Sequence, residues 1–214
     1  MILLPSRGRP GKAKRFFEAY HATQASMPGL LMIEERDRNA YADVRIPANW
    51  DRVIVDESLV SKKVNDAAFR FASGESCYLI MADDCVPETE HWDRKLAVSA
   101  GVTGIAYGND LMDPAPPIGH PCLGGELVRA LGWIAAPGFG HFYWDNVLRD
   151  IAEGLGVLTY RPEVITRHLH YTVTSDSDVF ERGHPINDKH IYAEWRRNDK
   201  QRDIERVRKA LFPC

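Results

Sequence analysis

Short apolar runs alternate with longer amphipathic stretches along this chain. Runs rich in apolar and β-branched residues predict strands at 2–4, 30–33, 52–55, 77–81, 102–107, 156–160 and 163–170. Apolar residues at helical spacing predict helices at 11–26, 61–72, 126–131 and 144–154, and a charged helix from 191 onward. The run at 77–81 is apolar throughout, which is typical of a strand buried on both faces of a parallel sheet. We therefore expect a layered α/β domain that binds its ligand at the carboxyl ends of the strands.

The composition fits one compact domain. The 214 residues are 44% hydrophobic and 27% charged, which excludes disordered, collagen-like and coiled-coil classes. The net charge of −3 argues against a protein that coats nucleic acid, although it leaves room for a local basic patch.

The cysteines and the apolar runs indicate where the protein works. Cys77, Cys85, Cys122 and Cys214 are far apart and have neither C-x-x-C nor zinc-ligand spacing, so we expect a reduced, cytoplasmic protein. The first apolar run is too short for a signal peptide, and no stretch approaches the ~20 apolar residues of a membrane span. No membrane partner is expected.

Two carboxylates, Asp83 and Asp84, directly follow the most apolar strand. Neighbouring like charges raise each other's pKa, and a hard divalent ion such as Mg²⁺ or Mn²⁺ relieves the repulsion. The alternative is a loop in which one aspartate caps a turn and the other is solvated.

His168 and His170 alternate on a predicted strand, so both side chains would face the same side. Imidazole suits Mn²⁺ or Zn²⁺ better than Mg²⁺, which makes the pair candidate metal ligands. Ordinary structural histidines are the alternative.

Two further segments suit phosphate and hydroxyl chemistry. The first strand is followed by a basic turn with Arg7, Arg9 and Lys12 before a helix, a combination that attracts anions but lacks the P-loop pattern. Asp145 follows three aromatic residues at a helix start, where it is either an N-cap or a general base.

Over residues 2–171, the order of these motifs resembles the GT-A glycosyltransferases, most closely family-2-like enzymes of a small phage or bacterial type. The resemblance implies a Rossmann-like three-layer sandwich with a mostly parallel central sheet. It also implies that the strand ending in Ala-Asp-Asp carries the metal motif, although the family usually has Asp-x-Asp. By this resemblance Asp145 occupies the catalytic-base position, with Trp144 in place of the usual acidic neighbour.

The resemblance also implies a set of ligand contacts. The nucleotide-sugar would be bound by residues from the first turn, the 61–72 helix, the metal strand and two later segments: Pro5, Ser6, Arg7, Arg9, Lys62, Asn65, Asp83, Gly124, Gly125 and Trp144. The metal, Mn²⁺ or Mg²⁺, would be held by Asp83, Asp84, His168 and His170.

The implied function is a metal-dependent glycosyltransferase that inverts the anomeric carbon. A UDP-sugar is the favoured donor, with a GDP-sugar as the alternative, and the acceptor is a hydroxyl on a saccharide or on a modified DNA base. A nucleotidyltransferase and a non-catalytic nucleotide-sugar-binding protein remain the rival interpretations. We expect residues 1–171 to form the catalytic domain and 172–214 to add a flexible loop, closing over the donor, and a helix packed on the same domain.

Overall fold

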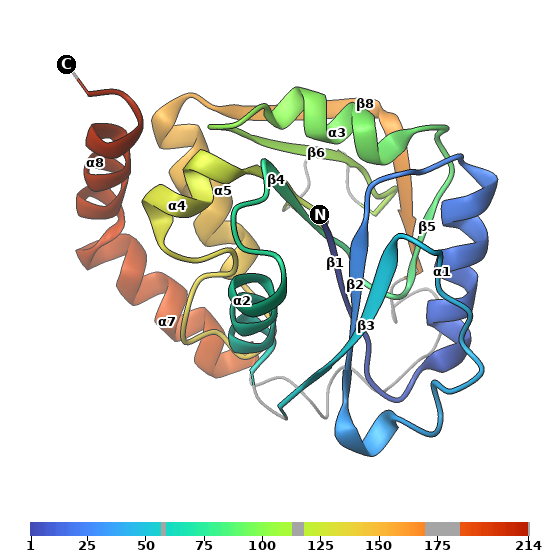
Figure 1. The fold of residues 1–214 in the computed structure, drawn as a ribbon. Helices are drawn as coiled ribbons and strands as arrows, with labels where there is room; N and C mark the ends of the chain where they lie inside the picture. The colour runs from blue at the N-terminus through green and yellow to red at the C-terminus, as the bar shows by residue number, and fades with distance from the viewer. Residues whose placement is uncertain (57–58, 113–117, 170–184, 214) are drawn as a thin grey trace.

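The fold is built on one mixed, curved sheet. The computed structural model describes residues 1–56, 59–112, 118–169 and 185–213. The strand order in this part of the chain is β3-β2-β1-β4-β7-β6-β8-β5 (Figure 1). The strands are β1 (Ile2–Pro5), β2 (Gly29–Glu34), β3 (Trp50–Val55), β4 (Cys77–Ile80), β5 (Cys85–Pro87), β6 (Ile105–Asn109), β7 (Cys122–Gly124) and β8 (Leu158–His168).

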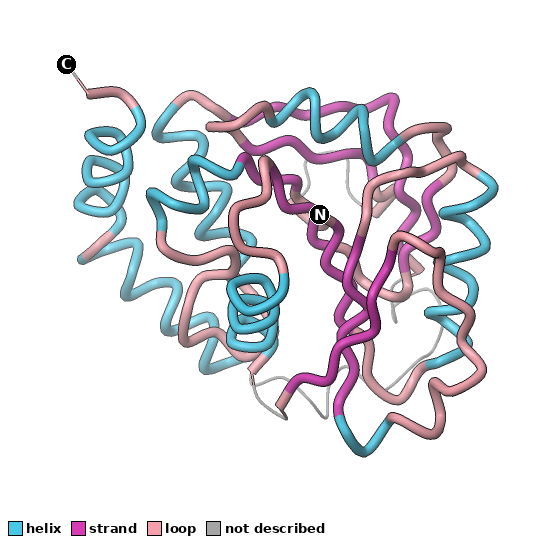
Figure 2. Tube along the Cα trace, viewed as in Figure 1, coloured by secondary structure: helices cyan, strands magenta, loops and turns pink. Residues whose placement is uncertain are grey.

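Helices cover both faces of the sheet (Figure 2). They are α1 (Pro10–Ala22), α2 (Val60–Phe71), α3 (Trp92–Ala100), α4 (Gly125–Leu131), α5 (Trp144–Leu155), α7 (Pro185–Asn198) and α8 (Lys200–Leu211), with a short 3-10 turn η1 (Glu35–Asp37). Residues of α1 and α3 belong to one hydrophobic core cluster, and residues of α2, α4 and α5 belong to a second. The predicted three-layer α/β sandwich is confirmed.

Strand directions bring several strand ends to one edge of the sheet. β1 is parallel to β2 and β4, β2 is parallel to β3, and β6 is parallel to β8. β7 is antiparallel to both β4 and β6, so β4 and β6 run the same way. We call the side on which β1, β2, β4, β6 and β8 end the carboxyl edge. This is where ligands bind in open α/β sheets.

The element pattern differs from the sequence prediction at short elements. β5, α3 and β7 were not predicted, because three-residue strands and a nine-residue helix give little periodic signal. The two strands predicted at 156–160 and 163–170 form one strand, β8, with an irregularity opposite β6. The single predicted tail helix is two helices, α7 and α8.

The end of the chain packs against the second core cluster. α7 begins at Pro185, inside the stretch 172–187 that was predicted to be a loop, while 172–184 lies outside the described residues. Ile204 and Val207 of α8 are buried, and Ile204 lies directly over Gly154 of α5. Among the described residues, none of the helices has the length and apolar character needed to cross a membrane.

Candidate functional site at the carboxyl edge

Asp83 is bound by the turn that follows β1. Its carboxylate accepts a hydrogen bond from Ser6 Oγ at 2.5 Å, and Arg9 Nη2 lies 2.5 Å from its other oxygen. Ser6 Oγ also contacts the Tyr41 hydroxyl at 2.6 Å. Burial raises the pKa of Asp83 to about 6, opposed by the positive charge of Arg9. The predicted basic turn and the predicted carboxylate pair therefore meet.

Asp84 contacts three positively charged or titratable side chains. Arg9 Nη1 and Lys12 Nζ lie 3.3 Å and 3.7 Å from Oδ2, and His168 Nε2 lies 3.3 Å from Oδ1. Burial acts to raise the pKa of Asp84, but His168 and the two cations outweigh it and hold that pKa well below its usual range. Asp84 is thus the more acidic member of the pair.

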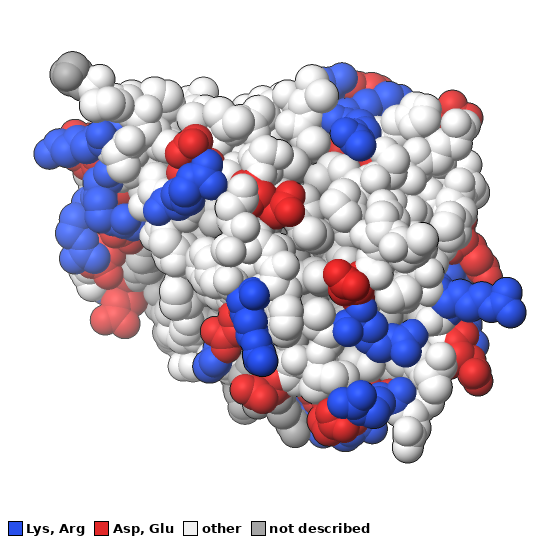
Figure 3. Space-filling view, viewed as in Figure 1, with Lys and Arg blue, Asp and Glu red and all other residues white. Residues whose placement is uncertain are grey.

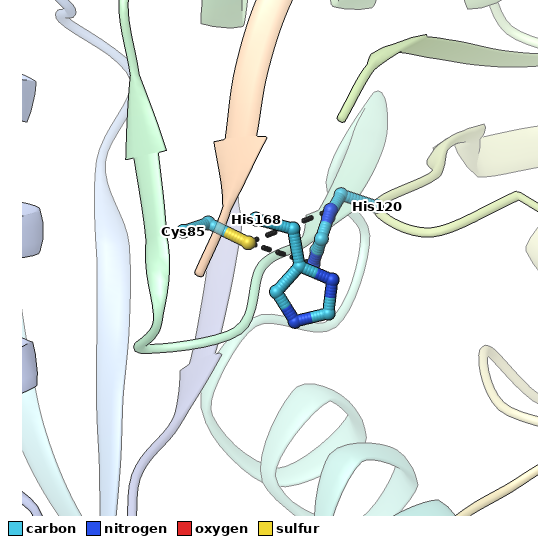
Figure 4. A group of neighbouring side chains, drawn as sticks. All are labelled: Cys85, His120 and His168. Atoms are coloured by element: carbon cyan, nitrogen blue, oxygen red, sulfur yellow. Dashed lines mark hydrogen bonds between the residues drawn. The ribbon is translucent and has the colours of Figure 1, made fainter. Parts of the chain in front are cut away.

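A thiol and a second imidazole lie beside His168 (Figure 4). Cys85 Sγ is 2.8 Å from His120 Nε2, and the rings of His120 and His168 meet edge to face with centroids 5.0 Å apart. Burial raises the pKa of the Cys85 thiol well above its usual range. Burial, with the nearby His168, lowers the pKa of His120 to about 3. One potential ligand atom from each of these three residues lies within 4.8 Å of the other two.

Arg7 lies on the other side of the β1 turn. Its Nε is 3.4 Å from Oε2 of Glu34, the last residue of β2, and Arg36 Nη2 is 2.6 Å from the same oxygen. Lys63 of α2 forms a short ion pair with the remaining oxygen of Glu34. Pro5 ends β1 itself. Two basic side chains of the same turn thus form ion pairs with different carboxylates. Arg7 pairs with Glu34, and Arg9 pairs with Asp83 and Asp84.

Asp145 is the second residue of α5 and is only partly buried. Because α5 immediately precedes β8 and packs antiparallel to it, the start of the helix faces the carboxyl edge. The loop that precedes α5 reaches the start of α2, where the Val60 N–H donates to the Gly140 carbonyl at 3.2 Å. Burial raises the pKa of Asp145 to about 6, and backbone N–H groups, including that of Asn146 at 3.0 Å, oppose the rise.

Two predicted nucleotide contacts on α2 are already engaged elsewhere. Lys62 forms an exposed ion pair with Asp66 one turn along the helix. Asn65 accepts hydrogen bonds from the Ile134 and Ala135 N–H groups at 2.7 and 3.0 Å and donates to the Ala135 carbonyl. Asn65 therefore positions the loop between α4 and α5.

The structure does not bring Gly124 and Gly125 to the aspartate pair. Gly124 is the register partner of Cys77, at the start of β4, so both glycines lie at the opposite edge of the sheet from Asp83. A Cβ on Gly125 would lie 2.2 Å from the Glu75 carbonyl oxygen, which explains why glycine is needed there. Trp144 is buried in the second core cluster, and His170 lies outside the described residues.

Sequence reasoning missed several members of the site. Cys85 follows Asp84 directly, so its position was a usable signal, whereas His120 lies in a Pro- and Gly-rich loop with no local pattern. Asp110 follows β6, and its backbone carbonyl accepts a hydrogen bond from the His168 N–H at 3.0 Å. Tyr41 lies in a turn region far from every predicted motif. These residues converge only through the sheet topology.

The predicted metal ligands fit a divalent ion in part. Asp84 and His168 offer a carboxylate oxygen and an imidazole nitrogen 3.3 Å apart, a pair that can bind a divalent metal ion. Asp83 is occupied by Ser6 and Arg9. The residues present therefore support a metal held by Asp84 and His168 rather than by the two carboxylates equally.

Comparisons with known proteins identify the class of fold. The chain has a GT-A-type α/β fold, and the predicted resemblance is confirmed at the level of the fold. No family model matches the chain, and no curated protein matches it.

Solved structures with this fold are distant in sequence. A 4-diphosphocytidyl-2C-methyl-D-erythritol synthase from Anaerococcus prevotii is 8% identical, with 85% of this chain and 95% of that chain covered and a TM-score of 0.56. Rv0371c from Mycobacterium tuberculosis, in complex with manganese, is 13% identical, with coverages of 79% and 91% and a TM-score of 0.52. Residues 1–349 of TarS from S. aureus are 8% identical, with coverages of 77% and 58% and a TM-score of 0.51.

Proposed function

We propose that this protein is a glycosyltransferase that transfers a sugar from a nucleotide diphosphate sugar to an acceptor hydroxyl, with Asp145 as the general base. The observation that carries this proposal is the partly buried Asp145 carboxyl on the carboxyl edge, whose pKa is raised to about 6. In the described part of the chain, its recorded hydrogen bonds come from backbone N–H groups rather than from a cation.

This observation supports glycosyl transfer over nucleotidyl transfer in our proposal. A sugar hydroxyl must lose a proton to attack, and a carboxylate with a pKa near the working pH is suited to accept it. A phosphate that attacks a nucleoside triphosphate is already ionised and needs no such base. Cytidylyltransferases share the fold, so the base is the feature that favours the glycosyl reaction.

The basic turn is suited to the donor diphosphate. Arg9 pairs with Asp83, and Lys12 lies 3.7 Å from Asp84. In our proposal the phosphate oxygens of the donor lie beside these two positive charges. We propose Mn²⁺ or Mg²⁺ as the cofactor, held by Asp84 and His168, where it would act as a Lewis acid on the leaving diphosphate. Attack from the side of Asp145, opposite the diphosphate, would invert the anomeric carbon.

For the acceptor we favour a saccharide hydroxyl over a modified DNA base. Arg202, Arg206 and Arg208 of α8 each lie beside an acid one turn away, at Asp199, Asp203 and Glu205. Acidic and basic side chains are also intermixed over the face of the molecule in Figure 3. These pairs engage three of the five basic side chains of α8, which lowers the positive charge that the helix offers to a polyanion.

The proposal is tested with a panel of UDP-, GDP- and dTDP-sugars, each with Mn²⁺ and with a set of saccharide acceptors. Wild-type protein is expected to transfer from one donor, with UDP-sugars favoured, and to give the inverted product. Release of pyrophosphate from a nucleoside triphosphate and a sugar phosphate, without sugar transfer, would instead establish the nucleotidyltransferase. If the protein binds none of these nucleotides, both the glycosyltransferase and the nucleotidyltransferase interpretations are refuted.

Asp145→Asn is the decisive variant. It should lower the transfer rate by at least about 100-fold, the usual contribution of a general base, while leaving the donor Kd unchanged. In wild type only the ionised carboxylate accepts a proton, so the rate should rise through pH 6 and level off above it. The exposed Asp66→Asn is the matched control. A variant at Asp145 that keeps near-wild-type transfer contradicts the assignment.

A further inference from the structure

Three residues with soft or borderline ligand atoms converge at the carboxyl edge from distant parts of the chain. Cys85 begins β5 and is the register partner of His168 at the end of β8, while His120 lies just before β7. Cys85 is fully buried and His120 is 5% exposed, whereas one fifth of the His168 side chain is accessible. The trio is therefore more accessible at His168 than at Cys85 and His120.

The spacing of these atoms is close to that of a tetrahedral metal site. Zinc bonds of ~2.3 Å to sulfur and ~2.0–2.1 Å to nitrogen place neighbouring ligand atoms about 3.3–3.6 Å apart. Here Sγ of Cys85 is 2.8 Å from Nε2 and 3.5 Å from Nδ1 of His120, and the ligand atoms of the trio lie within 4.8 Å of one another. Side-chain rotations that close the wider separations, which are at most 4.8 Å, to about 3.3–3.6 Å would complete the tetrahedral spacing.

Asp84 is the candidate fourth ligand, and it lies outside the trio whose ligand atoms are all within 4.8 Å of one another, so its side chain would have to turn toward the trio. Asp84 Oδ1 lies 3.3 Å from His168 Nε2, within the same range of ligand separations. The resulting donor set is one sulfur, two imidazole nitrogens and one carboxylate oxygen. Thiolate and imidazole select zinc-like transition metals, whereas Mg²⁺ and Mn²⁺ prefer oxygen.

The backbone around the ligands is fixed by hydrogen bonds. The Leu169 N–H donates to the Asp84 carbonyl at 2.9 Å, which ties the end of β8 to the aspartate turn. The loop that carries His120 passes close to Asp110, and a Cβ on Gly119 would lie 2.8 Å from the Asp110 carboxylate. Ligands held on paired strands in this way are organised before the ion arrives.

We propose that Cys85, His120 and His168, with Asp84 as the fourth ligand, form a binding site for one zinc-like transition-metal ion. The inference shares Asp84 and His168 with the proposed donor site, so a zinc-like ion bound here would take the place there of Mn²⁺ or Mg²⁺; it rests on metal binding and not on the reaction that the protein catalyses. A simple thiol–imidazole hydrogen bond between Cys85 and His120 would bind no ion, so ion binding that depends on the Cys85 thiol and on His120 is what the experiment must detect.

The test is a titration of the purified, chelator-treated and reduced full-length chain with Co²⁺, followed by displacement with Zn²⁺. Wild type is expected to bind one Co²⁺ with a thiolate-to-cobalt charge-transfer band in the near ultraviolet, which Zn²⁺ abolishes. Cys85→Ser should lose this band and weaken Zn²⁺ binding at least 10-fold. Cys122→Ser removes a different buried cysteine, in β7, and should keep the band.

His120→Gln provides a second measure that does not depend on the thiol variant folding. It should keep a thiolate band of altered shape and bind Zn²⁺ at least 10-fold more weakly. A wild-type complex without a thiolate band overturns the proposal, as does a Cys85→Ser protein with unchanged Zn²⁺ affinity. Nucleotide-sugar binding and transfer are measured in separate assays with Mn²⁺. A negative Co²⁺ and Zn²⁺ titration therefore leaves the proposed function standing, and a negative transfer assay leaves the proposed zinc-like site standing.

Discussion

Asp188 of α7 is the residue through which the end of the chain organises the loop leading to Asp145. Its side chain is 1% exposed and accepts three backbone hydrogen bonds, from the N–H groups of Gly140, His141 and Phe142, each at 2.9 Å. We expect Asp188→Asn to destabilise the protein and to loosen this loop, because no rotamer of asparagine can replace both carboxylate oxygens.

The magnitude follows from counting acceptors. Oδ2 serves His141 and Phe142, while Oδ1 serves Gly140. The single oxygen of asparagine retains two bonds at best, without their ionic character, and its NH₂ group then faces the Gly140 N–H. Hydrogen bonds to a charged group contribute about 1.5–3 kcal/mol each, so a loss of roughly 2–4 kcal/mol is expected. For a chain of this size, that lowers Tm by on the order of 5–10 °C.

Urea denaturation and thermal melts measure the loss, and hydrogen exchange locates it. In the variant, the amides of residues 140–142 should lose more protection from exchange than the fall in global stability explains. The amides of β1–β4 should lose only as much protection as that fall predicts. Asp66→Asn, which breaks an exposed ion pair, should cost less than about 0.5 kcal/mol. Equal stability of the two variants, or unchanged protection at 140–142, would refute the anchoring role.

Two further predictions concern packing and charge. Gly125→Ala should destabilise by about 1–3 kcal/mol in urea denaturation, because its Cβ would meet the Glu75 carbonyl oxygen at 2.2 Å. Gly11→Ala, in α1 with no atom within 4 Å, should be neutral or stabilising, and similar effects of the two changes would contradict this packing argument. Binding of single- or double-stranded DNA, if any, should be weak at physiological salt, and tight binding with a steep salt dependence in a fluorescence-anisotropy titration would restore the polyanionic acceptor.

The sequence predicts the architecture well because long apolar runs and helical periodicity report burial directly. The buried strand before Asp83 and the helix beginning near Asp145 illustrate this. Elements of only a few residues, such as β5 and β7, lack enough length for a pattern and form because neighbouring strands already offer their hydrogen-bonding edges.

The candidate site could be predicted only where its chemistry is local. Asp83 and Asp84 adjoin a strand end, and the basic turn adjoins another, so both were found. His120 joins them only because β7 runs antiparallel between β4 and β6 and thereby returns its preceding loop to the carboxyl edge. The spacing of residues along the chain gives no indication that His120 lies at the carboxyl edge. The interpretation of Asn65 as a nucleotide contact shows a different difficulty. An asparagine side chain suits a ligand contact and a loop contact equally well, and in the structure Asn65 bonds to the loop at Ile134 and Ala135.

The charges at the carboxyl edge bear on how an anionic donor would bind. Arg9 lies 2.5 Å from Asp83 and 3.3 Å from Asp84, so it already bridges both carboxylates. A diphosphate near Arg9 must compete with these carboxylates for the guanidinium. A cation at Asp84 would weaken the pairing of Arg9 with that residue and make it available to phosphate, while Ser6 still holds Asp83. We therefore infer that metal and diphosphate favour each other's binding at this edge, since each removes a competitor of the other.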